Sequence, residues 1–431
     1  MKRLAFLILS CASMSAFGAD VRVQTYGSAT DVQPRYMRNL VCISNSTCYS
    51  FSIDNESGGG LTGFVYRKTT DGGASWASPV VVQTNSTQEG GDVWYDQWTP
   101  GDTGTKIHMW YFDNTSDRVS WRTLDTSSDT LNTAVQVFGG ASAVGGRGAF
   151  VSGTKTRSGY LYCAYDIDAG AEKGLHRSTD SGATWSASLS STFVEATIDE
   201  CMLFPATGTG DNNDMWCIYQ DSSTDELTMK MWDSSAAAQV ESSSMATVIE
   251  CSVDESCQRN FAGAIRLSDG HLIMGAITRV ISGTADFKTW DVSGVTASSQ
   301  TGITAKTNIF TGITQSASGN VMYPSFYVNS SDVIYVAYSG KRDASETLGT
   351  TKVYYTKSTD GGTNWSAGDT TYMVGTATDT RQTWSSNSGP RFLVQWRQDV
   401  ASPNSGLWTN AANSIVSTSP NGFFQLLNPG Q

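Results

Sequence analysis

The sequence is poor in several features that define other protein classes. Among its 431 residues are only 9 prolines and 3 histidines, and charged residues make up 16%. It has no run of lysine or arginine, and its formal net charge is −12. Because contacts to phosphates require a basic face, we do not expect nucleic-acid binding. No stretch beyond the N-terminal region reaches the ~20 apolar residues of a membrane-spanning helix, and no sustained 3.6-residue apolar period predicts long helices.

The residues that are abundant favour short strands joined by tight turns. The chain has 42 glycines, 13 tryptophans and 17 tyrosines, together with many serines and threonines. Aromatic and β-branched residues prefer strands, and Gly, Ser and Asp prefer turns. We therefore expect an all-β protein.

The N-terminal segment MKRLAFLILSCASMSAFGAD is typical of a secretory signal. Lys2 and Arg3 form its basic start, an apolar stretch follows, and small residues precede Ala19. We predict a signal peptide at 1–18 and a single exported domain, secreted or periplasmic, at 19–431. A lipid anchor at Cys11 is the alternative, although the residues before it fit a lipoprotein site only loosely.

Seven cysteines remain after the signal is removed, and their spacing favours local disulfides in an exported protein. Local pairing leaves one cysteine, which we expect to be a buried apolar residue. No CxxC motif or Cys/His cluster predicts zinc, and we expect no metal or organic cofactor. The predicted pairs are Cys42/Cys48, Cys201/Cys217 and Cys251/Cys257, leaving Cys163.

One eight-residue stretch, called the octet here, occurs three times: TTDGGASW (69–76), STDSGATW (178–185) and STDGGTNW (358–365). Each copy follows a strand-like segment and precedes another, which predicts a hairpin turn. The first hydroxyl and the Asp can bond backbone N–H groups, the Gly two residues after the Asp can adopt positive φ, and the Trp can fold back over the hairpin. Asp71, Asp180 and Asp360 are thus turn-forming residues rather than catalysts.

The octets indicate a larger repeat. Their starts at 69, 178 and 358 are 109 and 180 residues apart, close to two and three multiples of a unit of roughly 50–60 residues, as propeller blades require. Degenerate units fill the gaps and retain a Trp at Trp121, Trp232, Trp290 and Trp408. Two strands joined by a hairpin precede each such segment, as in 260–278 and 323–339. We predict a β-propeller of four-stranded antiparallel blades, with seven blades or, alternatively, six with the C-terminal segment and segment 21–27 closing the ring.

The octet resembles the Asp-box, or bacterial neuraminidase repeat, of the sialidase superfamily. The resemblance covers most of residues 30–415 and implies an exo-α-sialidase-like glycoside hydrolase that binds a glycan. In that family three arginines bind the substrate carboxylate, an Asp is the general acid, and a Tyr assisted by a Glu is the nucleophile. Guanidinium groups match a carboxylate in shape and charge, and a neutral Tyr avoids the repulsion that an anionic nucleophile would meet.

The positions that match these roles begin an inner strand or end a second strand. The resemblance implies Arg38, Arg279 and Arg381 as carboxylate ligands, Asp54 as general acid/base, Tyr323 as nucleophile and Glu200 as its base. Rival residues are Arg35, Asp96 and Arg391. The chain departs from the family in two places: Asn39 and Leu40 break the Arg-Ile-Pro motif, and Gln258 and Arg259 stand where the family often has its Glu.

Two other functions fit the same fold, since a fold does not fix an activity. One is a non-catalytic propeller that binds a glycan or a protein. The other is a polysaccharide lyase on the same scaffold, although the three histidines lie beside strands and turns rather than at inner-strand starts. We expect a monomer in each case.

Overall fold

The fold is known from a computed structural model. It describes residues 20–25, 38–55, 62–84, 91–113, 118–139, 150–167, 173–190, 192–194, 198–208, 210–221, 226–247, 261–278, 284–294, 302–314, 324–340, 352–366, 370–371, 380–398, 406–411 and 414–416. Within these residues the elements are strands and one short 3-10 helix, η1 (Asp96–Trp98). No described helix has the length and apolar character to cross a membrane.

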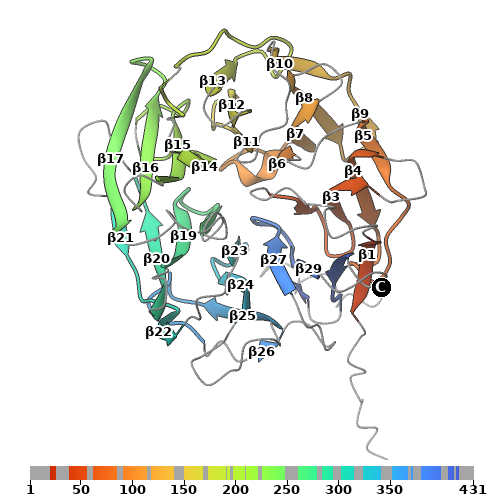
Figure 1. Cartoon of the computed structure of the whole chain (residues 1–431), viewed down its shortest axis with the longest axis vertical. Helices are drawn as coiled ribbons and strands as arrows, with labels where there is room; N and C mark the ends of the chain where they lie inside the picture. The colour runs from red at the N-terminus through yellow and green to blue at the C-terminus, as the bar shows by residue number, and fades with distance from the viewer. Residues whose placement is uncertain are drawn as a thin grey trace, which may run out of the picture.

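Seven antiparallel sheets stand around a common centre as the blades of a propeller (Figure 1). The first blade has β2 (Leu40–Cys42), β3 (Cys48–Asn55), β4 (Thr62–Thr69) and β5 (Val80–Thr84). The second has β6 (Gly91–Tyr95), β7 (Lys106–Asp113), β8 (Arg118–Asp125), β9 (Thr130–Leu131) and β10 (Val135–Gly139). The third has β11 (Phe150–Lys155), β12 (Leu161–Asp166) and β13 (Lys173–Ser178), with a bridge from Leu175 to Ser190 at its outer edge.

The remaining blades follow the same order from the centre outward. The fourth has β14 (Ile198–Pro205), β15 (Met215–Asp221), β16 (Glu226–Asp233) and β17 (Ala238–Thr247). The fifth has β18 (Phe261–Ile265), β19 (Leu272–Thr278), β20 (Thr284–Val292), β21 (Ile303–Ala305) and β22 (Phe310–Thr314). The sixth has β23 (Pro324–Val328), β24 (Ile334–Gly340), β25 (Lys352–Ser358) and β26 (Thr370–Thr371).

The seventh blade joins the two ends of the described chain. It contains β27 (Thr380–Ser385), β29 (Val394–Gln398) and β30 (Gly406–Thr409), and its outer strand is β1 (Val21–Thr25), which pairs with β30. Figure 1 shows the red β1 next to these blue strands. A separate two-stranded sheet pairs β28 (Arg391–Phe392), which lies between β27 and β29 in the sequence, with β31 (Ile415–Val416), which follows β30. The predicted propeller is confirmed with seven blades, and the N-terminal strand closes the seventh.

The core lies between the blades. Second strands are buried along nearly their whole length, as in β7, β15 and β19, because a neighbouring blade covers each face. This two-sided burial explains their unbroken apolar and aromatic sequences, such as MWCIY in β15. One apolar cluster runs continuously through the first five blades, from Val41 to Val292.

The three octets form the same turn between a third strand and the outer edge of a blade. In each, the Gly at the fifth position donates its N–H to the first hydroxyl at 2.8–2.9 Å, and the Asp accepts the N–H of the seventh residue at 2.9 Å. Hydrogen bonds from Thr184 and Ser178 lower the pKa of Asp180 to about 2. The fifth residue has positive φ, at 95°, 88° and 86° in Gly73, Gly182 and Gly362. The predicted turn chemistry is confirmed.

The octet tryptophans differ from the prediction, because they pack against the preceding blade rather than only over their own hairpin. Trp185 meets Trp121 of the second blade with ring centroids 6.3 Å apart. The Trp365 ring N–H donates to the Thr307 carbonyl of the fifth blade at 2.9 Å. Trp76 packs against the seventh-blade cluster of Val23, Trp384 and Leu407. Each octet therefore fastens its blade to the one before it.

The other repeat tryptophans are not equivalent to these three, which corrects the single series predicted above. Trp121, Trp232, Trp290 and Trp408 lie within third strands, whereas the octet tryptophans follow the turn. Without the Gly turn the strand continues through the Trp position. Its ring then packs as a strand residue, and in the second blade it receives the Trp185 ring.

The inter-blade contact of an octet can be separated from its backbone strain. A Cβ at Gly182 would lie 2.2 Å from the Trp121 ring, whereas a Cβ at Gly159 would meet nothing within 4 Å, and both residues have similar φ, 88° and 89°. We expect Gly159→Ala to cost about 1 kcal/mol through strain alone and Gly182→Ala about 2–4 kcal/mol through strain and overpacking. Chemical denaturation measures both losses of stability. Equal losses would contradict a stabilising contact between the octet and the preceding blade.

Candidate functional site

The candidate site lies at one end of the ring, which we call the mouth. Here the inner strands β2, β14, β23 and β27 begin and the second strands β3 and β19 end. The octet turns and the first hairpin of each blade belong to the opposite end, because neighbouring strands are antiparallel. All six candidate residues are attached by sequence to the mouth.

The structure describes two of the candidate residues fully, two in their backbone only, and two not at all. Arg38 stands two residues before β2 and Asp54 in β3, and both side chains are described. Glu200 is in β14 and Arg381 in β27, but only their backbone is described. Arg279, directly after β19, and Tyr323, directly before β23, lie outside the described residues. The rival Arg35 also lies outside them.

Arg38 reaches across the centre of the ring and contacts three blades besides its own. Its Nε donates to Asp92 Oδ1 at 3.0 Å, and its Nη2 donates to Asp92 Oδ2. Further bonds run from Nη2 to the Gly153 carbonyl at 2.7 Å and from Nη1 to the Leu203 carbonyl at 3.0 Å. Of the five guanidinium N–H groups, four are engaged, which leaves one on Nη1.

Aromatic rings cover the Arg38 guanidinium. Its Cζ lies 4.7 Å from the centroid of Trp94 and 5.4 Å from that of Phe204. The whole residue is only 5% exposed. Rings at this distance stabilise the cation through their π faces while excluding water from the ion pair. Arg38, Trp94 and Phe204 thus fill the centre between the first, second and fourth blades.

Asp92 is the residue that completes this network. Its Oδ1 also accepts the backbone N–H groups of Arg38 and Val93, and its Oδ2 accepts Ser152 Oγ at 3.1 Å and Gly153 N–H at 2.9 Å. Sequence reasoning missed Asp92, although an Asp within the buried strand GDVWY must have a partner. The buried strand shows that Asp92 needs a partner, but it does not show which residue that partner is. Arg38 lies 54 residues away in the sequence, and the two residues meet only because the blades form a ring.

Asp54 is also in a buried ion pair. Its Oδ2 accepts a bond from Arg67 Nη2 at 2.7 Å, and the two side chains are 2% and 6% exposed. Arg67 Nη1 donates in turn to Gln24 Oε1 at 3.0 Å. Gln24 belongs to the N-terminal strand β1, so the Asp54 network crosses from the first blade to the seventh. Sequence reasoning gave no sign of Arg67, which lies near the end of β4, a strand whose described residues are nearly all buried.

The described rivals lie at the opposite end of the ring. Asp96 follows β6 in η1, where His108 Nε2 donates to it at 2.8 Å and Lys155 Nζ at 2.6 Å. Arg391 donates to Asn45 in the first hairpin of the first blade and to Ala411. Neither shares a surface with the mouth, so neither can join Tyr323 or Glu200 in one site.

The charges around Asp96 are those of a structural cluster. Burial alone would raise the pKa of Asp96, but hydrogen bonds from His108 and Lys155 hold it well below its usual range. Burial lowers the pKa of His108, so its imidazole is neutral at pH 7. Burial opposes charge on Lys155, yet Asp102 and Asp96 raise the pKa of its ammonium above the ordinary value. The result is an ionised carboxylate held by one cation and one neutral ring.

Among the described residues, no three His, Cys, Asp or Glu side chains gather in a group that could hold a metal ion. Two disulfides are present, Cys42–Cys48 and Cys201–Cys217, and Cys163 is buried and free, as predicted. Cys251 and Cys257 lie outside the described residues.

Comparison with known proteins gives distant likenesses only. No protein-family model matches the sequence, and no curated protein matches it. AofleA from Arthrobotrys oligospora is 9% identical, with a TM-score of 0.46 over 83% of this chain and 91% of that one. The intramolecular trans-sialidase from Ruminococcus gnavus is 11% identical, with a TM-score of 0.43 over 92% and 98%. The polysaccharide lyase Uly1 is 8% identical, with a TM-score of 0.41 over 73% and 80%. Likenesses at this level do not bear on the activity of this chain.

The Arg38–Asp92 pair offers a direct test of the centre of the ring. We expect Asp92→Asn to lower the free energy of unfolding by about 3–5 kcal/mol, because a buried guanidinium loses its counter-charge. The control is Asp129→Asn, which removes the charge from the Lys68–Asp129 pair, where the side chains are 26% and 44% exposed. An exposed pair contributes about 0–1 kcal/mol. Equal losses in urea denaturation would show that the central pair has no special weight.

Proposed function

We propose that the chain is an exported, sialidase-like exo-glycosidase that hydrolyses terminal carboxylate-bearing sugars from glycans. The proposal is supported by one observation: the described strand ends that are adjacent in sequence to the six candidate positions lie at one end of a closed ring. The octet turns, which resemble the sialidase repeat, support the family assignment. The two disulfides support an oxidising compartment and hence export.

In the proposed mechanism, Glu200 takes the phenolic proton of Tyr323 as the Tyr323 oxygen attacks the anomeric carbon. Asp54 gives a proton to the departing glycosidic oxygen. Water then attacks the same carbon, with Asp54 now accepting its proton, and Tyr323 recovers its proton from Glu200. The arginines hold the carboxylate of the sugar and orient its ring.

The described contacts distribute these tasks unevenly. Arg38 has one N–H group left beyond its bonds within the ring, so it can make a single bond to the substrate. The bidentate contact is then assigned to Arg279 and Arg381. Asp54 has to leave its Arg67 ion pair and take up a proton from solvent as the substrate enters, before it can give that proton to the glycosidic oxygen.

A non-catalytic, glycan-binding propeller is the second candidate function. It is favoured by a specific observation: Arg38 and Asp54 both use their charges on buried partners, Asp92 and Arg67. A binding site needs neither a free acid nor a nucleophile. It would retain the arginines of the mouth as hydrogen-bond donors to sugar hydroxyls or carboxylates.

Release of 4-methylumbelliferone from its α-sialoside by the purified chain tests the proposal. We expect turnover by the wild type and at least a 100-fold loss of kcat in Tyr323→Phe, which removes the nucleophilic oxygen. Tyr160→Phe is the matched control, because Tyr160 lies in the β11–β12 hairpin at the opposite end of the ring and keeps its ring over Arg177. No turnover by the folded wild type, together with binding of the sialoside, would establish the second candidate instead.

A further inference from the structure

The ring closes where the seventh blade meets the first, at a boundary that we call the seam. On one side stand β27, β28, β29, β30 and β1, and on the other stand β2, β3, β4 and β5. The chain passes from β1 of the seventh blade to β2 of the first, so the bond that completes the ring is the pairing of β1 with β30 within the seventh blade. Closure at the seam rests on β1 pairing with β30 and on contacts between the two blades.

Among the described residues, the apolar clusters at the seam are small. One cluster contains Leu40, Cys42 and Cys48 of the first blade and Leu393 of the seventh. A second contains Val23, Trp384 and Leu407, and the octet residue Trp76 packs against both. By contrast, the cluster of the first five blades is continuous. Since burial scales with apolar area, these two described clusters contribute less to the seam than the continuous cluster contributes to the first five blades.

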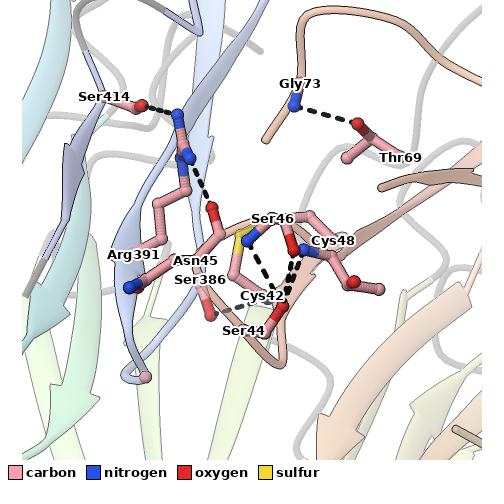
Figure 2. Close-up of a disulfide and its surroundings, with 12 residues drawn as sticks. Cys42, Ser44, Asn45, Ser46, Cys48, Thr69, Gly73, Ser386, Arg391 and Ser414 are labelled. Atoms are coloured by element: carbon pink, nitrogen blue, oxygen red, sulfur yellow. Dashed lines mark hydrogen bonds between the residues drawn. A yellow bond between two sulfur atoms is a disulfide. The ribbon is translucent and has the colours of Figure 1, made fainter. Parts of the chain in front are cut away.

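Polar contacts cross the seam in several places. Near the mouth, Arg67 Nη1 donates to Gln24 Oε1 at 3.0 Å, and in mid-strand Ser50 Oγ donates to Gln395 Oε1 at 3.0 Å. At the opposite end, another group meets the β2–β3 hairpin, shown in Figure 2. Arg391 of β28 donates to the Asn45 carbonyl at the hairpin tip, and the Cys42 N–H donates to Ser386 Oγ at 3.3 Å. From the octet, the Gly72 N–H donates to the Ser46 carbonyl at 2.7 Å. The seventh blade, the hairpin and the octet turn therefore meet in one joint.

The Cys42–Cys48 disulfide lies across the base of this hairpin. The two cysteines are directly opposed in the β2–β3 ladder, with Cα atoms 4.1 Å apart, and both are fully buried. Their sulfur atoms belong to the apolar cluster that includes Leu393. The bond thus fixes the strands that present Asn45 and Ser46, while its own atoms form part of the seam.

We propose that oxidation of Cys42 and Cys48 to the disulfide stabilises the closure of the propeller. We call this role of the disulfide the lock. The two thiols form the bond by exchange with a small-molecule disulfide: they lose two protons and two electrons, and the oxidant is reduced to two thiols. Once formed, the bond holds the hairpin in the conformation that receives Arg391 and Leu393. The inference does not depend on the proposed glycosidase activity.

The second disulfide provides a matched control. Cys201 is in β14 and Cys217 in β15, so the bond links neighbouring strands within the fourth blade. Both residues belong to the continuous cluster of the first five blades. Loss of this bond should weaken the fourth blade without acting on the seam.

Hydrogen–deuterium exchange of the full chain tests the lock. Relative to the oxidised wild type, we expect Cys42→Ala/Cys48→Ala to speed exchange of the β1 and β30 amides by about tenfold or more, with β15 and β16 unchanged. Cys201→Ala/Cys217→Ala should leave β1 and β30 as protected as in the wild type. Equal protection of β1 and β30 in both variants, or a uniform increase over all blades, would overturn the proposal.

Two further measurements apply if the cysteine variant does not fold. Native wild type reduced stepwise should expose β1 and β30 as Cys42 and Cys48 become alkylatable, and continued protection after their reduction would overturn the lock. Gly72→Ala should release the same amides with the disulfide intact, because its Cβ would lie 2.1 Å from Arg391 Nη1. Gly361→Ala, at the same octet position of the sixth blade, has its nearest atom at 3.8 Å and should not.

Discussion

Covering both faces of every sheet is the constraint on which this structure depends. The second strands β7, β15 and β19 carry apolar or aromatic side chains on both faces. A blade on its own would expose both of these faces to water, at about 25 cal/mol for each Å² of apolar surface. A circular array covers both faces by giving every blade two neighbours. Closing the circle then becomes the remaining problem, and β1 solves it by joining a blade that begins more than 350 residues later in the chain.

The octets also help to cover the sheets, because each one packs against the preceding blade at the outer side of the ring. Each binds its own turn by side-chain to backbone hydrogen bonds and presents a Gly and a Trp to the preceding blade. A glycine is required for two reasons at Gly182: its φ is 88°, and the Trp121 ring occupies the space of a Cβ. The octets occur in the first, third and sixth blades, which explains spacings of two and three repeat units. In the fifth blade the strand continues through Trp290, so no turn is available there for the same contact.

Local chemistry was predictable from the sequence, and contacts made by the ring were not. The octet turn, the two described disulfides and the burial of Cys163 depend on residues that are close in sequence or on one residue's own character. The direction of the octet tryptophans could not be inferred, because it depends on which blade lies alongside. Asp92 and Arg67 were missed for the same reason: a polar residue in a buried strand needs a partner, but its identity is fixed by blade order. The mouth itself was predictable only as a set of strand ends, since propeller topology brings inner-strand starts together whatever their side chains.

The charge balance of Arg38 bears on what the mouth can recognise. A guanidinium that is already neutralised by Asp92 and covered by Trp94 and Phe204 exerts little net attraction on a second carboxylate. Its position is nevertheless fixed by bonds to the second, third and fourth blades, so its remaining N–H points in one direction without loss of side-chain entropy on binding. In the proposed site, Arg38 would therefore orient a bound group rather than attract it. Attraction of an acidic sugar to a chain with a net charge of −12 would then fall to Arg279 and Arg381, the other two arginines of the proposal.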